Sequence, residues 1–350
     1  MAKTNLAKAK ADKNDEFYTQ YTDIQKEVNN YLEYNPHLFK DKIIFLPCDD
    51  PEWSNFTKFF AQNFTRFGLK KLISTSYAPE SKNIKATYAP SLFEQNDPKF
   101  DKKKTITNGK IFTLTSDRTG DGKIDVNDLE WEYLKGDGDF RSAEIKKLRD
   151  EADFIITNPP FSLFREFLMW IMEGRKQFLI LGNMNAITYK EVFPLIKENK
   201  IWAGAGFNMS MVYRSPNKNV LEANRKFVQQ KGYDPELHIK VPAVNWYTNI
   251  PHAKRFQKME FMSIKKIEKH GKGIKFIKYD NYDAIEIPLV KFIPIDYEGL
   301  MGVPITFLQN YNPEQFELIK FRKGDNDKDL TINGKCPYFR IIIKHKSQKK

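Results

Sequence analysis

The chain has little cysteine: Cys48 and Cys336 are the two among 350 residues, and they lie far apart in the sequence. This excludes a disulfide framework and a cysteine-rich zinc cluster, so we expect a reducing compartment. Apolar runs long enough to span a bilayer are also missing, and the charged first residues lack the apolar stretch of a secretory signal. Together these absences predict a soluble, cytoplasmic protein without a membrane partner.

Acidic residues are in the minority, with 45 Asp and Glu against 57 Lys and Arg, for a formal net charge of +12. A basic excess of this size suits a polyanionic partner such as nucleic acid, although ordinary solubility charge would give the same balance. Hydrophobic residues make up 41% of the chain and aromatic residues 14%, which excludes a disordered chain and indicates a globular protein.

The first two hundred residues alternate between strand-like and helix-like patterns. The strand-like runs are compact and apolar: 42–47, 70–77, 152–158 and 177–183. The helix-like runs carry apolar residues at helical spacing: 24–32, 49–64, 142–151, 164–174 and 188–199. Alternation of this kind predicts an α/β fold with a mainly parallel sheet, and Pro194 is expected to kink the last of these helices.

The regular alternation is lost in two regions. After residue 78 the pattern loosens, and the segments 83–90 and 109–115 suggest a hairpin inserted into the core. Beyond residue 200 the segments favour β-structure, are rich in aromatic and basic residues, and are broken by prolines. A further helix is expected to start at Pro313.

The strand at 152–158 ends in the tetrapeptide Asn158-Pro159-Pro160-Phe161, and a helix-like run follows. Two acceptors placed against an exocyclic base amine make its nitrogen more nucleophilic and stabilise the charge that appears during methyl transfer. Asn158 can supply a side-chain oxygen, and Pro160 stiffens the chain that presents the Pro159 carbonyl. Phe161 offers a face on which an extruded base can stack. The alternative is a proline-stiffened turn without chemistry.

Several further segments follow one another along most of the chain: "NDEFYTQYTDI", "CDDPEWSNFTKFF", "GDGDFRSAEI", "EADFIITNPPFSLFREF", "VNWYTNIPHAKR" and "YDNYDAIEIP" with the segments after it. Together and in this order, they resemble the S-adenosylmethionine-dependent amino-methyltransferases of DNA, and more narrowly the adenine-specific EcoRI modification methylase family. The tetrapeptide alone is shared with methylases of rRNA and of protein glutamine, so the specificity comes from the set.

The resemblance implies a Rossmann-like methyltransferase core at 1–200 and a less regular DNA-recognition region at 201–350 that packs back on the core. It also implies S-adenosyl-L-methionine as the cofactor, double-stranded DNA as the partner and methyl transfer to N6 of a flipped-out adenine. Such an enzyme serves a restriction-modification system or acts as an orphan methylase. A cognate restriction endonuclease is a further candidate partner.

The resemblance transfers cofactor-binding positions onto Phe17, Tyr18, Thr19, Cys48, Asp49, Asp139 and Phe140. Phe17, Tyr18 and Thr19, with Asp15 before them, would close over the cofactor. Many methyltransferases have a glycine-rich turn where this chain has Cys48 and Asp49. The strand at 70–77 lacks the acidic residue that commonly binds the cofactor ribose, which leaves Asp49 and Asp50 as candidates.

Basic residues beyond residue 200 stand among aromatic ones, a pattern that suits phosphate contacts and contacts with unstacked bases. The candidates for DNA binding are Arg214, Lys254 and Arg255. The neighbouring aromatic residues are Trp202, Tyr213, Trp246 and Tyr247. Each of these residues, taken alone, is also explained as a solvated charge or a core aromatic.

The segment Asp117–Asp128 nearly fits a calcium loop, with Asp121, Gly122, Ile124 and Asp125 in register. A strand-like run precedes it where an EF-hand needs a helix, and its last position is Asp where a bidentate Glu is expected. We therefore expect a turn-rich surface loop there, and no metal in the active site.

Two other functions remain open. An enzyme with the same tetrapeptide that methylates RNA or protein glutamine would share the core chemistry. A DNA-binding protein with a decayed cofactor site, without enzymatic activity, would explain the missing glycine-rich turn.

Overall fold

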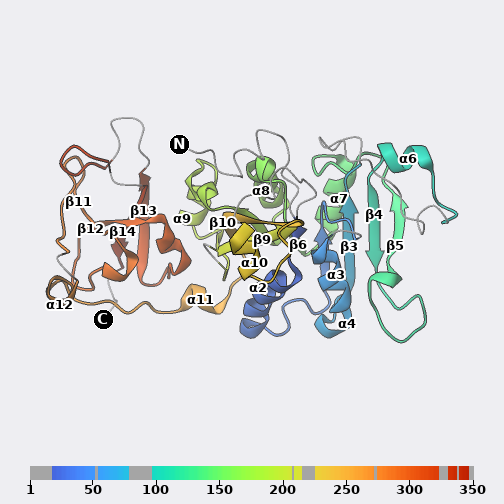
Figure 1. Ribbon diagram of the computed structural model, residues 1–350, viewed down its shortest axis with the longest axis horizontal. Helices are drawn as coiled ribbons and strands as arrows, with labels where there is room; N and C mark the ends of the chain where they lie inside the picture. The colour runs from blue at the N-terminus through green and yellow to red at the C-terminus, as the bar shows by residue number, and fades with distance from the viewer. Residues whose placement is uncertain are drawn as a thin grey trace. The chain divides into compact units, whose positions relative to one another are not determined.

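The computed structural model describes residues 18–51, 54–78, 97–206, 209–214, 225–271, 274–322, 330–336 and 339–346 (Figure 1). The described residues form two compact units, one within 1–184 and 209–250 and the other within 185–208 and 251–350. The assignment of catalysis to 1–200 and of recognition to 201–350 stays a prediction. None of the helices in the described ranges combines the length and apolar character needed to cross a bilayer.

The first unit is built on a sheet with the strand order β1-β9-β10-β7-β6-β2-β3-β4-β5. Its central strands β7, β6, β2 and β3 are parallel, and the strands at both edges are antiparallel. The strands are β1 (Tyr18–Thr19), β2 (Ile43–Leu46), β3 (Lys71–Ser76), β4 (Lys110–Leu114), β5 (Glu130–Tyr133), β6 (Phe154–Thr157), β7 (Gln177–Asn183), β9 (Met209–Arg214) and β10 (His238–Thr248). The expected α/β fold is confirmed, but the sheet is mixed rather than mainly parallel, because its four central strands pair in parallel while β9, β10, β4 and β5 pair antiparallel on either side of them.

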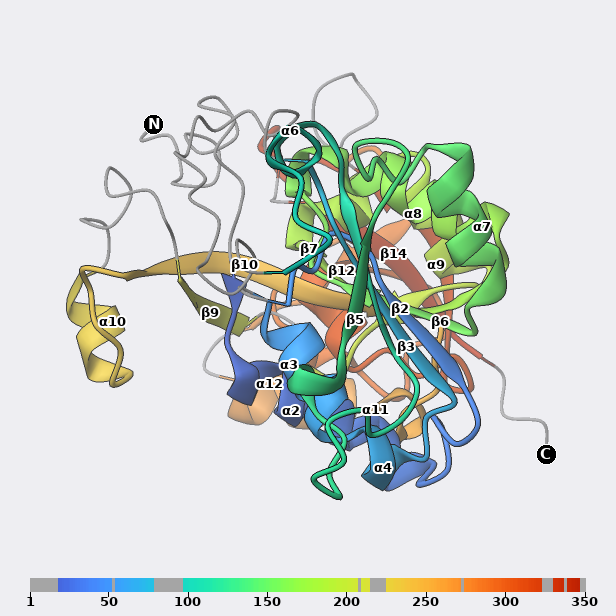
Figure 2. The ribbon, with the colours of Figure 1, turned by 90° about the vertical axis from the view of Figure 1, so that its right-hand side faces the viewer.

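Alternate residues of the central strands face opposite sides of this sheet. On β2, Ile44 and Leu46 belong to a core cluster with Phe56 and Phe60, whereas Phe45 between them is buried on the other side. Burial on both sides explains why these strands are continuous apolar runs. Figure 2 shows α2, α3 and α4 on one side of the sheet and α7 and α8 on the other. The helices are α2 (Tyr21–Tyr34), α3 (Asn55–Gln62), α4 (Phe64–Phe67), α6 (Lys102–Thr107), α7 (Ala143–Glu151), α8 (Phe164–Glu173) and α10 (Arg225–Gln230).

The start of α8 depends on a close approach to β7. A Cβ atom on Gly182 would lie 2.3 Å from Cε2 of Phe164, the first residue of α8. Glycine is therefore needed at this position of β7 for the Phe164 ring to pack against the strand. The Tyr247 ring on β10 contacts Phe164 with their centroids 5.0 Å apart. This packing fixes the chain directly after the Asn-Pro-Pro-Phe segment.

The second unit contains a smaller sheet with the order β11-β12-β14-β13. A largely buried ion pair braces it, because Arg340 Nε on β14 lies 3.0 Å from both carboxylate oxygens of Glu286 on β11. The strands of the unit are β8 (Trp202–Ala203), β11 (Ala284–Glu286), β12 (Leu300–Pro304), β13 (Phe316–Arg322) and β14 (Arg340–His345). Its helices are α9 (Val192–Lys197), α11 (Ala253–Phe256) and α12 (Ile264–His270).

The prediction of a helix that starts at Pro313 is wrong. Residues 313–315 form a turn in which the Asn312 side-chain oxygen accepts the backbone N–H of Glu314 at 2.8 Å. The strand β13 follows, with Phe316 and Leu318 buried and Glu317 exposed between them. Burial with a period of two is that of a strand, and pairing with β14 decides the outcome.

Two smaller expectations also differ from the structure. The segment 109–115 does form β4, but β4 pairs with β3 and β5, and the proposed hairpin partner at 83–90 lies outside the described residues. Pro194 does not kink a long helix, because α9 begins at Val192. In the first turn of a helix, the missing N–H of proline breaks no hydrogen bond.

Candidate functional site

The carboxyl ends of β2, β3 and β6 lie side by side, because these strands are parallel neighbours. The hydroxyl of Thr157, the last residue of β6, donates a 2.7 Å hydrogen bond to the carbonyl of Pro47, just beyond β2. This bond holds Asn158 next to the segment that contains Cys48 and Asp49. Ligands of open α/β sheets bind beyond such carboxyl ends, so this edge is the candidate active site.

Cys48 makes the turn after β2 with a φ of +65°, in the left-handed region that favours glycine. Its backbone N–H donates to Oγ1 of Thr75 on β3 at 3.4 Å. The chain therefore makes a glycine-like turn here without glycine, and the residue carries backbone strain of a kind that gathers at functional sites.

Asp49 is a buried carboxylate beside this turn. Its Oδ1 accepts the Ser54 hydroxyl at 2.6 Å, whereas the buried Oδ2 makes no hydrogen bond within the described part of the chain. Burial raises the pKa of Asp49 to about 7, against the hydrogen bond from Ser54, which lowers it. A buried acceptor of this kind is costly unless a ligand supplies the missing donor.

Thr19 is attached to the same edge. The Asn55 side-chain amide, at the start of α3, donates a 2.7 Å hydrogen bond to the backbone carbonyl of Thr19. Thr19 is buried, and β1 pairs with β9. Phe17 and the side chain of Tyr18 lie outside the described residues. Of the three predicted N-terminal positions, the structure thus places Thr19 close to the Cys48–Asp49 segment.

Asp139 lies at the carboxyl end of β3 and is held by two neighbours. Arg141 donates from Nε at 2.9 Å and from Nη2 at 2.6 Å, and the Tyr77 hydroxyl lies 3.4 Å from Oδ2. The hydrogen bond from Arg141 lowers the pKa of Asp139, so this carboxylate is charged at neutral pH. Gly138 (φ +89°) lets the loop pass the Ser76 carbonyl, which a Cβ atom would approach to 2.5 Å.

Phe140 is packed inside the first unit rather than open to a ligand. Its ring contacts Phe167 and Trp170 of α8, with centroids 5.2 and 5.7 Å apart. The side chain is 4% exposed. Phe140 therefore anchors the loop that presents Asp139, and a direct contact between its ring and a cofactor stays a prediction.

The four residues Asn158, Pro159, Pro160 and Phe161 continue from β6 along this edge. Oδ1 of Asn158 and the whole of Pro159 are buried, whereas Phe161 is half-buried against the core cluster. The Pro160 carbonyl accepts the Leu163 N–H at 2.9 Å and so starts the 3₁₀ turn that leads into α8. The segment is rigid and presents an amide oxygen and an aromatic ring beside Asp49.

The candidate DNA-binding residues lie in different surroundings. Arg255 is 7% exposed; its guanidinium lies 3.9 Å from the ring centroid of Trp202 and donates to Asn199 at 2.8 Å. Burial lowers the pKa of Arg255 to about 10. Lys254 is exposed and donates to the Ala205 carbonyl at 2.8 Å. The Arg214 side chain lies outside what the structure describes, and all three DNA contacts stay predictions.

Three of the aromatic residues that the sequence groups with these basic residues belong to the core of the first unit. Tyr213, Trp246 and Tyr247 are all fully buried on β9 and β10. The Trp246 ring packs against Phe56 of α3 with centroids 6.0 Å apart. They support the sheet. The alternative interpretation from the sequence, that they are aromatic residues of the core, therefore holds for them.

The segment Asp117–Asp128 folds as a series of turns that ends in the 3₁₀ helix Val126–Asp128. Asp128 accepts the backbone N–H groups of Arg118, Thr119 and Asp125 at 2.9 Å each. These bonds lower the pKa of Asp128 to about 2. Within the described ranges, no group of three or more His, Cys, Asp or Glu side chains is arranged to hold a metal ion.

Four side chains that build the candidate site escape prediction from the sequence: Ser54, Asn55, Tyr77 and Arg141. Two carried a signal, because Ser54 is a helix-capping residue before an apolar helix face and Arg141 directly follows Asp139 and Phe140. Asn55 and Tyr77 carried none, since their partners Thr19 and Asp139 are distant in the sequence.

Known proteins are similar to this chain over nearly its whole length. The family model of the adenine-specific methyltransferase EcoRI matches residues 5–346. The chain is 43% identical to the Type II methyltransferase M.EcoRI of Escherichia coli, over 99% of this chain and 97% of that protein. It is 33% identical to the Type II methyltransferase M.MpnI of Mycoplasma pneumoniae, over 97% of both chains.

A third relative is the Type II methyltransferase M.MgeORF184P of Mycoplasma genitalium. It is 34% identical over 96% of this chain and 97% of its own length. No solved structure matches the chain.

Proposed function

Because the chain belongs to the family of the adenine-specific EcoRI methyltransferase, we propose that it transfers a methyl group from S-adenosyl-L-methionine to N6 of adenine in duplex DNA. The observation that carries the proposal is the 2.7 Å bond from Thr157 to Pro47, which places Asn158 beside the buried Asp49. In this proposal, Asp49 would accept a hydrogen bond from the cofactor and Asn158 would accept one from the target amine, at the same edge of the sheet.

The residues at this edge fit the cofactor. S-adenosyl-L-methionine carries an ammonium group and ribose hydroxyls, and it supplies the activated methyl group when bound. The buried Oδ2 of Asp49 can accept a hydrogen bond from such a donor, and Asp139 adds a charged acceptor at the end of β3. Thr19, whose carbonyl accepts a hydrogen bond from Asn55, lies near the same place.

The Asn-Pro-Pro-Phe segment would act on the target base. The side-chain oxygen of Asn158 and the Pro159 carbonyl accept the two amine hydrogens, which orients the nitrogen lone pair toward the methyl group. Phe161 stacks on the flipped-out adenine. These residues need no general base before transfer, because the methylated amine can lose its proton to water afterwards.

The names of the relatives, which are called Type II methyltransferases, support a proposal for the biological setting. We infer that the chain is the modification enzyme of a restriction-modification system or an orphan methylase. In the first case, an endonuclease that cuts the same site is its partner. Sequencing genomic DNA from cells that express the protein, with detection of modified bases, would identify the base and the site together.

The direct test of the activity is transfer of radiolabelled methyl groups to duplex DNA, with RNA and protein as competing substrates. Label in DNA adenine is expected; label in RNA or protein instead would contradict the proposal. Asn158→Ala should abolish transfer and leave cofactor affinity, measured by calorimetry, within a few fold. Asn30→Ala, at a partly exposed position of α2, is the matched control and should retain full activity. Unchanged activity of Asn158→Ala would refute the role of the amide.

A further inference from the structure

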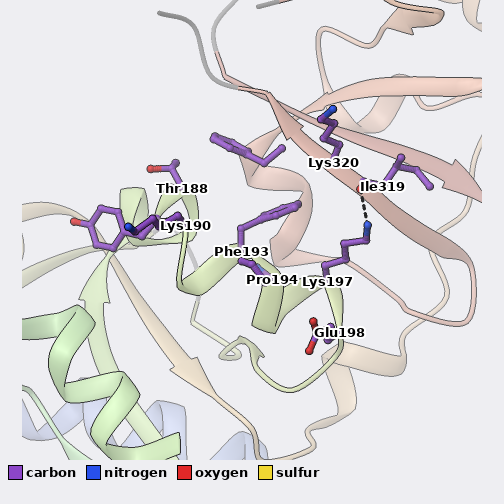
Figure 3. Close-up of a pocket in the computed structure, with 10 residues that line it drawn as sticks. Thr188, Lys190, Phe193, Pro194, Lys197, Glu198, Ile319 and Lys320 are labelled. Carbon is purple, nitrogen blue, oxygen red and sulfur yellow. Dashed lines mark hydrogen bonds between the residues drawn. The ribbon is translucent and has the colours of Figure 1, made fainter. Parts of the chain in front are cut away.

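The second unit contains a cavity of about 600 Å³ between α9 and β13 (Figure 3). Figure 3 shows Phe193 and Lys197 rising from α9 toward β13, with Ile319 and Lys320 across from them. The residues that matter for its chemistry are Tyr189, Lys190, Phe193, Lys197, Lys320 and Phe321. Its volume lies within the range of about 300–1,000 Å³ that is common for small-ligand sites.

Aromatic rings form one wall of this cavity. Phe193 on α9 and Phe321 on β13 contact each other with their centroids 5.6 Å apart and their planes at 45°. Both side chains are half-buried, so each ring keeps accessible surface on the cavity side. Such a wall suits a flat aromatic ligand, because nucleic-acid bases stack on exposed phenylalanine faces whatever their sequence.

The cavity is also positively charged. Lys190 and Lys320 are exposed, and the Lys190 side chain keeps 88% of its surface accessible while its Nζ lies 3.9 Å from Oε1 of Glu191. Lys197 donates to the Ile319 carbonyl at 2.9 Å and so ties α9 to β13. The single lining carboxylate, Glu198, is paired with Lys200 at 2.7 Å, outside the lining. A ligand with negative charge beside an aromatic ring matches this surface.

We propose that this cavity binds one unstacked nucleotide of the DNA substrate. The base stacks on the wall formed by Phe193 and Phe321, and the adjoining phosphates contact Lys190 and Lys320. The inference rests on the proposed function in one respect, namely that DNA is the substrate. It adds a second nucleotide site, separate from the Asn158 segment. An acidic peptide is less suitable, because carboxylate side chains offer no flat ring to an aromatic wall.

The test uses the full-length protein and a duplex with one unpaired 2-aminopurine, compared with the same duplex fully paired. Fluorescence anisotropy gives both affinities, and quenching of 2-aminopurine reports stacking. Phe193→Leu and Phe321→Leu keep apolar volume but remove the ring. Each should weaken binding of the unpaired-base duplex at least fivefold, the equivalent of about 1 kcal/mol for one base stack, and should relieve the quenching.

Phe292→Leu is the matched control, because this half-buried phenylalanine lies in the same unit and does not line the cavity. Lys190→Gln and Lys320→Gln should reduce the affinity and its salt dependence, whereas Lys265→Gln on the exposed side of α12 should not. Equal affinities for wild type and the two cavity Phe→Leu variants would overturn the inference. Competition for the unpaired-base duplex by free adenosine monophosphate or polyglutamate, at the concentration of the oligonucleotide, would also overturn the inference.

Methyl transfer to paired duplex DNA is measured in parallel with the wild-type protein. Intact transfer, together with unchanged binding by the Phe→Leu variants, would refute the nucleotide site alone. Absence of both transfer and DNA binding in the wild type would refute the proposed function itself.

Discussion

The hydroxyl of Thr157 donates a hydrogen bond to the carbonyl of Pro47, across 110 positions of sequence and at a distance of 2.7 Å. Thr157 is fully buried, and it immediately precedes Asn158 just as Pro47 precedes Cys48. One side chain thus couples the segment proposed to hold the target amine to the segment proposed to hold the cofactor.

Thr157→Val keeps the shape of this side chain and removes the donor, so the Pro47 carbonyl loses a buried hydrogen bond. We expect a loss of about 1–3 kcal/mol in the free energy of unfolding, measured by urea denaturation, and a lower kcat. Thr107→Val on the exposed side of α6 is the control and should change stability by less than about 0.5 kcal/mol. Equal stability and activity of the two variants would show that the bond does not couple the segments.

Asp49 should make stability fall as the pH rises. Burial raises its pKa from 3.8 to about 7, so the folded protein keeps a proton that the unfolded chain releases. The free energy of unfolding therefore decreases between about pH 4 and pH 7. Above that range, Asp49 causes no further change in it. Asp49→Asn should remove this slope and be more stable than wild type by a few kcal/mol at pH 8, as measured by urea denaturation. A slope that persists in the variant would assign it to another group.

The same carboxylate should give cofactor binding the opposite dependence on pH. The ionised form attracts the cationic cofactor, so affinity measured by calorimetry should rise as the pH increases through about 7. Asp49→Asn should bind the cofactor at least tenfold more weakly, with no such rise. If the Asp49→Asn variant is more stable than wild type but binds the cofactor weakly and without pH dependence, Asp49 acts on the ligand and not only on the structure.

Cys48 offers a test of the missing glycine-rich turn. Its left-handed backbone costs an L-residue about 1–2 kcal/mol, so Cys48→Gly should fold at least as stably as wild type and retain activity. Cys48→Val should be destabilised by about 1–3 kcal/mol in urea denaturation, because a β-branched residue tolerates this conformation poorly. Equal loss in both variants would show that the sulfur atom, rather than the backbone conformation, is what the turn requires.

The parts of the fold that could be predicted from the sequence are those with strong local patterns. The apolar runs of β2 and β6 and the apolar face of α3 follow from residues that are close in the chain. The turn at Cys48 could not be predicted, because no glycine marks it. The strand β13 could not be predicted either, because Pro313 suggests the start of a helix and pairing with β14 decides the conformation.

The candidate site likewise has residues that could be predicted from the sequence and an arrangement that could not. The Asn158 segment was identifiable because its four residues are consecutive and their chemistry is specific. Their arrangement with Asp49 and Asp139 depends on contacts made by Thr157 and Tyr77 between distant parts of the chain. Sequence spacing gives no signal for such contacts, and the parallel register of the sheet brings them about.

Arg141 is the positioning residue with the clearest test. It holds Asp139 through Nε and Nη2, and its Nη1 lies 3.3 Å from Glu166 on α8, the helix after the Asn-Pro-Pro-Phe segment. Arg141→Gln frees the Asp139 carboxylate to rotate, so the KM for the cofactor should rise about three- to tenfold while kcat changes less than twofold.

Lys147→Gln removes the same charge from an exposed position of α7 and should leave both constants unchanged. Arg141→Lys should recover part of the affinity, because one ammonium group replaces only one arm of the two-point contact. Because Arg141 itself is exposed, its loss should leave the urea midpoint nearly unchanged. A fall in kcat with an unaltered KM would instead place Arg141 in the transfer step and contradict a positioning role.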